Sequence, residues 1–224
     1  ISFINTSGVV DGSLIMINVE PGAYGALPKQ YCQLDSAAIA VLPVPYDNTS
    51  TWMKGANKGP EAILEASSHM ELYDIETDSE VYRQGIITME PVSCPEDPKE
   101  MAAVVYGAAR MLSKQDKFIV GIGGEHSVSI GLVRAAAKKY ADLSVLQLDA
   151  HADTRDVYEG SSYNHACVMS RIGEICPYVQ AGIRSMDISE REGMDRKRTF
   201  FAHELLGNAD VVPNIYRSLT QNVY

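Results

Sequence analysis

The sequence predicts an α/β fold with three layers, in which helices cover both faces of a mainly parallel sheet. Short apolar runs alternate with segments of helical periodicity along the 224 residues. The apolar runs are continuous, as in strands that are buried on both faces. A chain of this length suits one large domain, because single cores grow to roughly 250 residues before chains split. We therefore expect one domain over residues 1–224.

Five apolar runs are expected to form the strands of this sheet. They are Ala37–Val44, Gly85–Met89, Phe118–Ile122, Ser144–Leu148 and Tyr178–Ile183. In open parallel sheets, ligands bind beyond the carboxyl ends of the strands, where the loops diverge. The loops that follow residues 122 and 148 are therefore the first places to look for a site.

Four segments between these runs predict helices. They are Pro60–Leu72, Pro98–Lys114, Val128–Tyr140 and Cys167–Ile175. The start of the second is the best marked, since Asp97 stands at the capping position, Pro98 in the first turn and Glu100 at the third position. The apolar stripe that runs from Met101 to Leu112 marks its buried face.

Composition limits the classes of partner. The chain has 29 acidic against 19 basic residues, a formal net charge of −10. This charge argues against nucleic acid or an anionic membrane as partner, because both need clustered Lys and Arg. No apolar run approaches the roughly 20 residues that a membrane helix needs. We therefore expect neither a membrane-spanning protein nor a nucleic-acid partner.

Cysteine usage and the first residues bear on location. Cys32, Cys94, Cys167 and Cys176 form no Cys-x-x-Cys pair, so we expect four free thiols in a reducing cytoplasm. The segment Ile1–Glu20 lacks a basic opening and carries an acidic residue, so it does not fit a secretory signal. The expected location is cytoplasmic.

Two loops are rich in metal-ligand residue types. The first, Gly123–Ser127, contains His126, and the second alternates Asp149, His151 and Asp153. Side chains at i, i+2 and i+4 of an extended segment project to one side. Oxygen and nitrogen donors without sulfur favour Mn²⁺, or another divalent ion that accepts oxygen ligands, over structural zinc. A helix cap or an ordinary polar histidine would explain one such residue, but it explains four of them poorly.

These ligands are too few for two ions. A pair of divalent ions calls for about ten coordination positions. The four residues supply two negative charges and about five positions, if one carboxylate bridges. Asp156 and Glu125 are nearby in the sequence, but Glu125 is expected to point away from His126. One ion could be held with water completing its shell, whereas two would need more carboxylates.

The two loops resemble the first two metal signatures of the ureohydrolase superfamily, which contains the arginases and agmatinases. The resemblance covers nearly the whole chain. Further stretches are similar to the family's substrate-side loop, first helix and a later strand with its exit loop: Pro45–Asp47 followed by Gly55, Gly59–Glu61, and Ala181–Ser185. The resemblance implies the arginase-like three-layer fold.

The resemblance also implies a dinuclear manganese hydrolase. By motif, His126 and Asp153 would complete the shell of one ion, His151 would serve the other, and Asp149 would bridge the two. A hydroxide whose pKa the ions lower would attack the guanidinium carbon, and the products would be urea and an amine. His165 matches the family histidine that carries a proton to the leaving amine. Its alternative role is a histidine at the start of a helix.

The chain departs from the family at one point. The third signature, a Ser-x-Asp-x-Asp strand end that supplies two further carboxylates, is missing, and the sequence ends at Tyr224, about where that strand should begin. It also lacks an initiator Met. We expect the natural product to continue for several tens of residues, and this fragment to be weak or inactive as an enzyme. By resemblance, the complete protein would form trimers or hexamers.

The expected substrate is agmatine, which would give urea and putrescine. The stretch Gly160–His165 lacks the Ser-Gly-Asn pattern of arginases, and Tyr163–Cys167 looks more like agmatinases. Agmatine has two cationic ends and no carboxylate, so an acidic site suits it. Asp187 and Glu190 could contact its distal amine, or could be solvated loop acids. Arginase, guanidinobutyrase or formimidoylglutamase activity remains open, as does a non-catalytic ureohydrolase-like binding protein. The intact ligands and His165 speak against the non-catalytic alternative.

Overall fold

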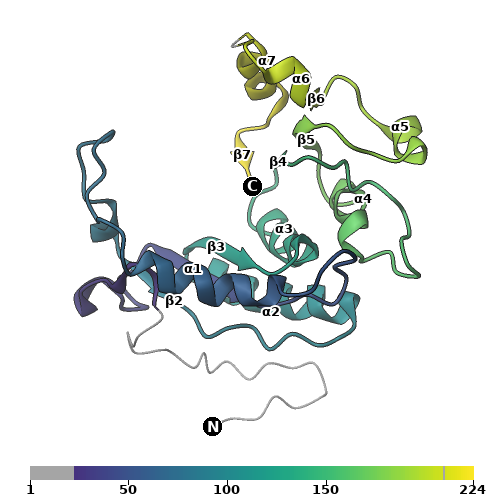
Figure 1. The fold of residues 1–224 in the computed structure, drawn as a ribbon. Helices are drawn as coiled ribbons and strands as arrows, with labels where there is room; N and C mark the ends of the chain where they lie inside the picture. The colour runs from purple at the N-terminus through teal and green to yellow at the C-terminus, as the bar shows by residue number, and fades with distance from the viewer. Residues whose placement is uncertain (1–22, 209) are drawn as a thin grey trace.

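The computed structural model describes residues 23–208 and 210–224 (Figure 1). The strands in these ranges are β1 (Ile39–Val44), β2 (Ile86–Thr88), β3 (Phe118–Gly123), β4 (Leu143–Leu148), β5 (Tyr178–Ile183), β6 (Thr199–Phe201) and β7 (Asn222–Val223). The α-helices are α1 (Gly59–Ser67), α2 (Pro98–Lys114), α3 (Ser129–Ala137), α4 (Val168–Gly173), α5 (Ile188–Gly193), α6 (Ala202–Leu205) and α7 (Val211–Ser218). The absence of a secretory signal was predicted from residues 1–20, which lie outside the described residues.

All five predicted strands and all four predicted helices are present. The cap before α2 is confirmed, because the Asp97 carboxylate accepts a hydrogen bond from the Glu100 backbone N–H at 2.8 Å. Helix α1 ends at Ser67, five residues before the predicted end. Strands β6 and β7 and helices α5 to α7 were not predicted from the sequence. Except for the eight-residue α7, these elements have six residues or fewer, too few for a hydrophobic period to stand out.

The strands pair only in parallel, as expected, but they are divided between two sheets. The first sheet has the order β2-β1-β3 and the second the order β6-β5-β4-β7. The sequence had predicted one sheet. Strand β7 pairs with β4 on the side away from β5, and an apolar groove of about 550 Å³ lies between β3 and β7. Phe118 and Val223 line this groove from the two edges.

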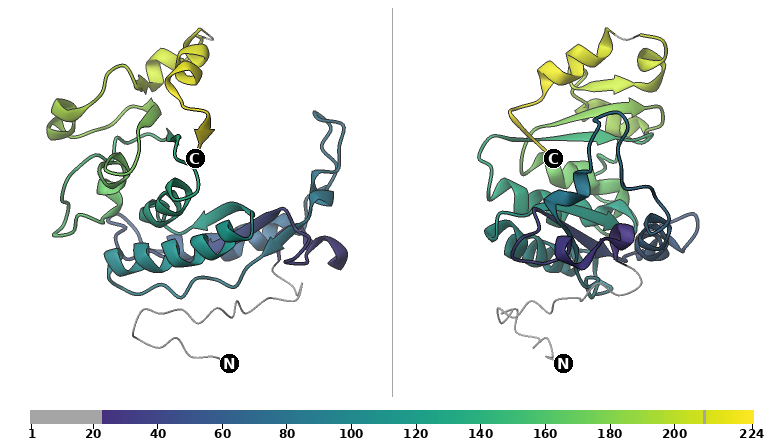
Figure 2. Two further views of the ribbon diagram at one scale, coloured as in Figure 1. Left: turned by 180° about the vertical axis from the view of Figure 1, so that it is seen from behind. Right: turned by 90° about the vertical axis from the view of Figure 1, so that its left-hand side faces the viewer.

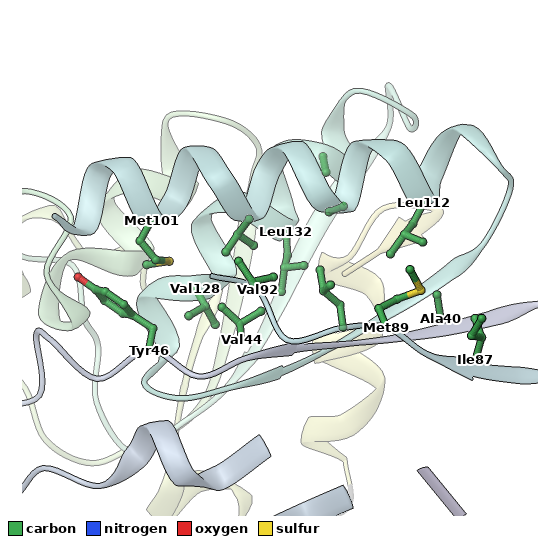
Figure 3. Packing of buried hydrophobic residues seen from close by; sticks show 14 of the residues in the cluster. Ala40, Val44, Tyr46, Ile87, Met89, Val92, Met101, Leu112, Val128 and Leu132 are labelled. Carbon is green, nitrogen blue, oxygen red and sulfur yellow. The ribbon is translucent and has the colours of Figure 1, made fainter. Parts of the chain in front are cut away.

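Two hydrophobic cores hold the molecule together. In the first, alternate residues of β1, such as Ala40 and Val44, face α2, where Met101 and Leu112 are buried (Figure 3). The opposite face of this sheet packs against α1, so three layers form here as predicted.

The second core joins α3 and α4 to β4 through Ile130, Met169 and Val145. Helix α3 belongs to both cores, since its Leu132 packs in the first. Gly131 permits this, because a Cβ there would lie 2.6 Å from the Ala102 carbonyl oxygen of α2. Figure 2 shows α3 between the part of the molecule that contains the first sheet and the part that contains the second. The loops at the carboxyl ends of β3 and β4 are therefore carried on a shared helical support.

The cysteines and the helices bear on two further predictions. Cys32, Cys94, Cys167 and Cys176 are all free thiols, as expected. Among the helices described, none is both long and apolar enough to cross a membrane.

Candidate metal centre

The predicted ligands lie on the loops that follow β3 and β4. His126 begins a short 3₁₀ turn after β3, and Asp149 follows β4 directly. Only glycine fits at position 124, where the loop after β3 passes close to the backbone of Tyr46: a Cβ there would lie 1.9 Å from the Tyr46 backbone oxygen. The Gly124 and Glu125 amides donate to the carbonyls of Val44 and Tyr46 at 3.2 and 2.8 Å. The loop after β3 is thereby fixed to the end of β1.

Three of the four predicted ligands gather into one cluster. His126, Asp149 and Asp153 each offer a ligand atom, and these atoms all lie within 4.8 Å of one another. Nδ1 of His126 is 3.5 Å from Oδ2 of Asp149, and its Nε2 is 3.6 Å from Oδ2 of Asp153. Residues from two different sheets therefore meet at one point.

His151 lies at the edge of this cluster. Its Nδ1 is 3.6 Å from Oδ1 of Asp149, and its side chain is largely exposed. Asp149 therefore presents one oxygen toward His126 and the other toward His151. A carboxylate that bridges two cations needs this arrangement, which is the role that the resemblance implies for Asp149. The ligand role of each residue stays a prediction.

Asp153 is held in an unusual backbone conformation. Its φ is 53°, in the left-handed region that Asp and Asn tolerate better than other side chains. Its backbone oxygen accepts a hydrogen bond from the amide of Met169 in α4 at 2.9 Å. The turn aims the Asp153 carboxylate back toward His126 and buries it.

Two glutamines that the sequence analysis did not single out support this loop. Gln147 and Gln180 are paired in register on β4 and β5, and Nε2 of Gln180 donates to Oε1 of Gln147 at 2.6 Å. Gln180 also donates to the carbonyl of Ala152 at 2.7 Å, and Gln147 lies 3.3 Å from Oδ2 of Asp153. The sequence signal was present: two polar side chains interrupt otherwise apolar strands.

The electrostatics of the cluster favour a cation. Burial, together with the nearby charges of Asp149 and Glu190, outweighs the neighbouring histidines and raises the pKa of Asp153 to about 6. The pKa of Asp149 is well below its usual range, mainly because of its contact with His126. Burial works to lower the pKa of His126, but the two carboxylates outweigh it and raise that pKa. Asp149 and Asp153 both lie beside the single imidazole of His126, which can balance at most one negative charge. A divalent cation would balance both.

His165 lies beside the cluster. Its ring centroid is 6.1 Å from that of His126 and 6.1 Å from that of Tyr158, which meets it edge-on. Its Nδ1 is buried, with no hydrogen-bond partner among the residues described. Burial lowers the pKa of His165, which favours the neutral imidazole. It also starts a 3₁₀ turn, so its alternative role as a histidine at a helix start coexists with its place in the site.

Glu125 is not part of the cluster of ligand atoms that contains His126. Both of its oxygens are engaged: Oε2 accepts from the amide of Ser127 at 2.8 Å, and Oε1 accepts from the Ser127 hydroxyl at 2.6 Å. It is buried. Glu125 therefore organises the loop that carries His126.

The two predicted substrate contacts have structural partners. Asp187 caps α5 by accepting from the amide and hydroxyl of Ser189, and its side chain is 45% exposed. Glu190 is buried and accepts from the amides of Thr154 and Asp187, both at 2.8 Å. Arg155 lies 3.8 Å from both carboxylates. Contact with a substrate amine stays a prediction, better suited to Asp187 than to Glu190.

The fold and these side chains define an α/β protein with a candidate site for a divalent metal ion. Comparison with known proteins identifies its family. The sequence profile described as "Arginase family" matches residues 37–224. The chain is 35% identical over 217 residues to the N(1)-aminopropylagmatine ureohydrolase of Synechocystis, covering 89% of this chain and 71% of that protein. It is 30% identical over 195 residues to the agmatinase of Pyrococcus horikoshii, covering 85% and 67%.

A solved structure agrees. The agmatine ureohydrolase of Thermoplasma volcanium superposes with a TM-score of 0.77 at 27% identity, over 86% of this chain and 67% of that one. The chain belongs to the arginase family. The predicted resemblance to the ureohydrolases, and to agmatinases in particular, is thereby confirmed.

Proposed function

We propose that the protein, in its complete form, hydrolyses a guanidino compound to urea and an amine, with agmatine as the leading substrate. The observation that carries this proposal is the convergence of His126, Asp149 and Asp153, with the ring of His165 beside them. A metal cluster alone would fit many proteins. An imidazole next to it, with its Nδ1 buried, could act as the proton carrier that the departure of an amine requires.

The donor set fits Mn²⁺. Two carboxylates with imidazole, and no sulfur, are ligands that Mn²⁺ accepts. The raised pKa of Asp153 supports the same fit, because a buried carboxylate beside a second one lacks a full counter-charge. His126, Asp149 and Asp153 would hold one ion, and His151 with Asp149 would contribute to a second. When bound, such ions polarise the substrate and supply a hydroxide nucleophile near neutral pH.

Protein side chains would carry out substrate binding and proton transfer. Because Asp149 and Asp153 would have their charge engaged by the ions, attraction of a cationic substrate group falls to carboxylates outside the cluster, such as the exposed Asp187. His165 would accept a proton that originates from the hydrolytic water and deliver it to the nitrogen that leaves as the amine. Tyr158 lies edge-on to His165 and is in turn covered by the guanidinium of Arg155, 4.7 Å from its ring centroid, so the imidazole has a fixed wall on that side.

The amine end of the substrate is less well defined. Relatives named as acting on N(1)-aminopropylagmatine make that compound a second candidate. It carries a longer cationic tail than agmatine, and the exposed Asp187 would suit either amine. Arginine, guanidinobutyrate and formiminoglutamate each carry a carboxylate, which the negative charge of Asp187 would repel. A homo-oligomer and a cytoplasmic location remain expectations.

The direct test is urea release. The full-length protein, loaded with Mn²⁺, would be assayed against agmatine, N(1)-aminopropylagmatine, arginine and guanidinobutyrate side by side. Urea from one or both of the first two supports the proposal. Urea from another substrate keeps the reaction and replaces the substrate. No urea from any of them, with metal shown to be bound, contradicts it and favours a non-catalytic role.

A variant of His165 separates proton transfer from metal binding. In His165→Asn we expect Mn²⁺ affinity within about threefold of the wild type, since this side chain lies outside the ligand cluster. The turnover number should fall by roughly 100- to 10,000-fold, the scale of a lost general acid-base group. Metal affinity and the turnover number would be measured on one preparation. Equal losses in both would make His165 a ligand rather than a proton carrier.

A further inference from the structure

One hydroxyl joins three loops around the site. Oγ1 of Thr49 donates to Oε1 of Glu125 at 2.9 Å and accepts from the backbone N–H of His165, also at 2.9 Å. Thr49 lies on the loop after β1, Glu125 on the loop after β3, and His165 on the segment before α4. The three are distant in sequence, so this contact exists only in the folded chain.

The loop that carries Thr49 is itself rigidly held. The Asp47 carboxylate accepts from the hydroxyl of Ser50 and the amide of Gly55. The ammonium of Lys54 donates to the carbonyls of Asp47, Asn48 and Ser50 at 2.7, 3.0 and 2.8 Å. A loop closed by this many polar contacts presents the Thr49 hydroxyl in one place.

The Glu125 end of the bridge is equally fixed. Ser127 donates twice to Glu125, and the Glu125 amide is bonded to Tyr46. Thr49 is 8% exposed and Glu125 is 9% exposed. A hydrogen bond to a carboxylate is stronger than a neutral one, and shielding from water strengthens it further. The bridge is therefore anchored one residue away from His126.

The His165 side chain needs such support. Its Nδ1 has no hydrogen-bond partner among the described residues, so that nitrogen does not fix the ring. The position of the imidazole depends on its backbone and on the wall formed by Tyr158. The backbone N–H of His165 is bound by Thr49. An error of about 1 Å in the placement of a catalytic group can cost about 100-fold in rate.

We propose that Thr49, anchored by Glu125, is a positioning residue that sets the distance between the His165 imidazole and the loop carrying His126. The role in turnover rests on the function proposed above, whereas the bridge itself can be tested without it. The hydroxyl of Thr49 is bonded to Glu125 and to the amide of His165, neither of which is a predicted metal-ligand atom. It acts through the backbone of His165.

The test uses the full-length protein and three variants. Thr49→Val keeps the shape and removes both hydrogen bonds, whereas Thr49→Ser keeps the hydroxyl. Thr51→Val changes an exposed threonine on the same loop and is the control. Three quantities would be measured: amide hydrogen exchange over residues 158–167, Mn²⁺ affinity by titration, and kcat and KM for urea release.

In Thr49→Val, the His165 amide should exchange about tenfold faster, because the hydrogen bond that protects it is lost. The turnover number should fall by roughly 10- to 100-fold, with KM and Mn²⁺ affinity within about threefold of the wild type. Thr49→Ser should restore exchange and turnover to within about threefold, and Thr51→Val should change neither.

Other outcomes overturn the proposal. Unchanged exchange and turnover in Thr49→Val would show that the hydrogen bonds of Thr49 do not position His165. If Thr49→Ser is as impaired as Thr49→Val, the effect comes from packing. A parallel loss of Mn²⁺ affinity would place the role in the metal loop. Rapid exchange of the His165 amide in the wild type refutes the bridge, even if Thr49→Val does not fold. If the wild type releases no urea, the proposed function fails while the exchange data still test the bridge.

Discussion

Two acidic loops in this protein look alike in sequence and differ in their surroundings. Each follows a strand of the same sheet and carries two carboxylates within five residues: Asp149 and Asp153 after β4, and Asp187 and Glu190 after β5. In the first loop the carboxylates face histidines, and only Asp149 also accepts from a backbone amide, that of His151 at 2.9 Å. In the second they accept hydrogen bonds from backbone amides and cap α5.

The pKa values show the consequence. Burial and nearby acids raise the pKa of Asp153 to about 6. Hydrogen bonds from the hydroxyl and amide of Ser189 lower the pKa of Asp187. The Asp187 charge is met by the amide and hydroxyl of Ser189 and so stabilises the start of α5. Asp153 is buried near two other acids with one long contact to the Gln147 amide, an environment that favours a cation. Partners, rather than residue type, thus separate a metal site from a helix cap.

The largest expected effect is on metal binding by the first loop. Asparagine tolerates the left-handed backbone of Asp153, so Asp153→Asn should fold while losing a charged ligand. We expect Mn²⁺ affinity and urea release to fall by at least about 100-fold, the upper end of what losing a supporting group costs a metal site. Asp156→Asn, three residues along and 83% exposed, is the control. Full activity in Asp153→Asn would refute the metal assignment.

The same variant should have the opposite effect on the metal-free protein. The folded pKa of Asp153 is above its unfolded value of 3.8, so the folded state holds the extra proton and loses stability as pH rises from about 4 to 6. Asp153→Asn avoids this loss. Its free energy of unfolding at pH 7 should exceed that of the wild type by about 1–3 kcal/mol, and the gain should disappear below about pH 4. Denaturant unfolding in a metal chelator, across this pH range, would measure it.

The first loop could be predicted from sequence because its signal is local. Alternating ligands after a buried strand mark their shared direction, and the apolar run of β4 fixes the strand end. The turn at Asp153 was not predictable, since its positive φ depends on contacts with α4 and on the glutamines of β4 and β5. The bridge through Thr49 was not predictable either, because its partners Glu125 and His165 lie 76 and 116 positions further along the chain.

In the fold, too, features with a local sequence signal were predictable, whereas features that depend on distant segments were not. Strands β1 to β5 and helices α1 to α4 were predicted because each has a clear apolar pattern or a cap. The division into two sheets was not, because the sequence of a strand does not say which edge it will pair with. In the second acidic loop, the capping box of Asp187 and Glu190 could have been read from an acidic pair spaced three residues apart.

The buried acid of the second loop should matter for stability. In Glu190→Gln the new amide group would face a backbone N–H in place of an acceptor, so we expect the free energy of unfolding to fall by about 1–2 kcal/mol. The exposed Glu192→Gln on the same helix is the control. Thermal and denaturant unfolding would measure the effect. A KM for agmatine raised more than about tenfold at unchanged stability would instead make Glu190 a substrate contact.

The smallest effect is expected at the exposed acid of the second loop. Asparagine caps a helix about as well as aspartate, so Asp187→Asn removes the charge and keeps α5. If that charge attracts the distal amine, KM for agmatine should rise only a few-fold, because an exposed ion pair is weak and Arg155 already shares this carboxylate. The turnover number and stability should not change. Steady-state kinetics at low and high salt would test this, since the difference in KM between variant and wild type should shrink as salt screens the charge. An unchanged KM at both salt concentrations would leave Asp187 with its helix cap as its role, and the two acidic loops would then differ completely in what they do.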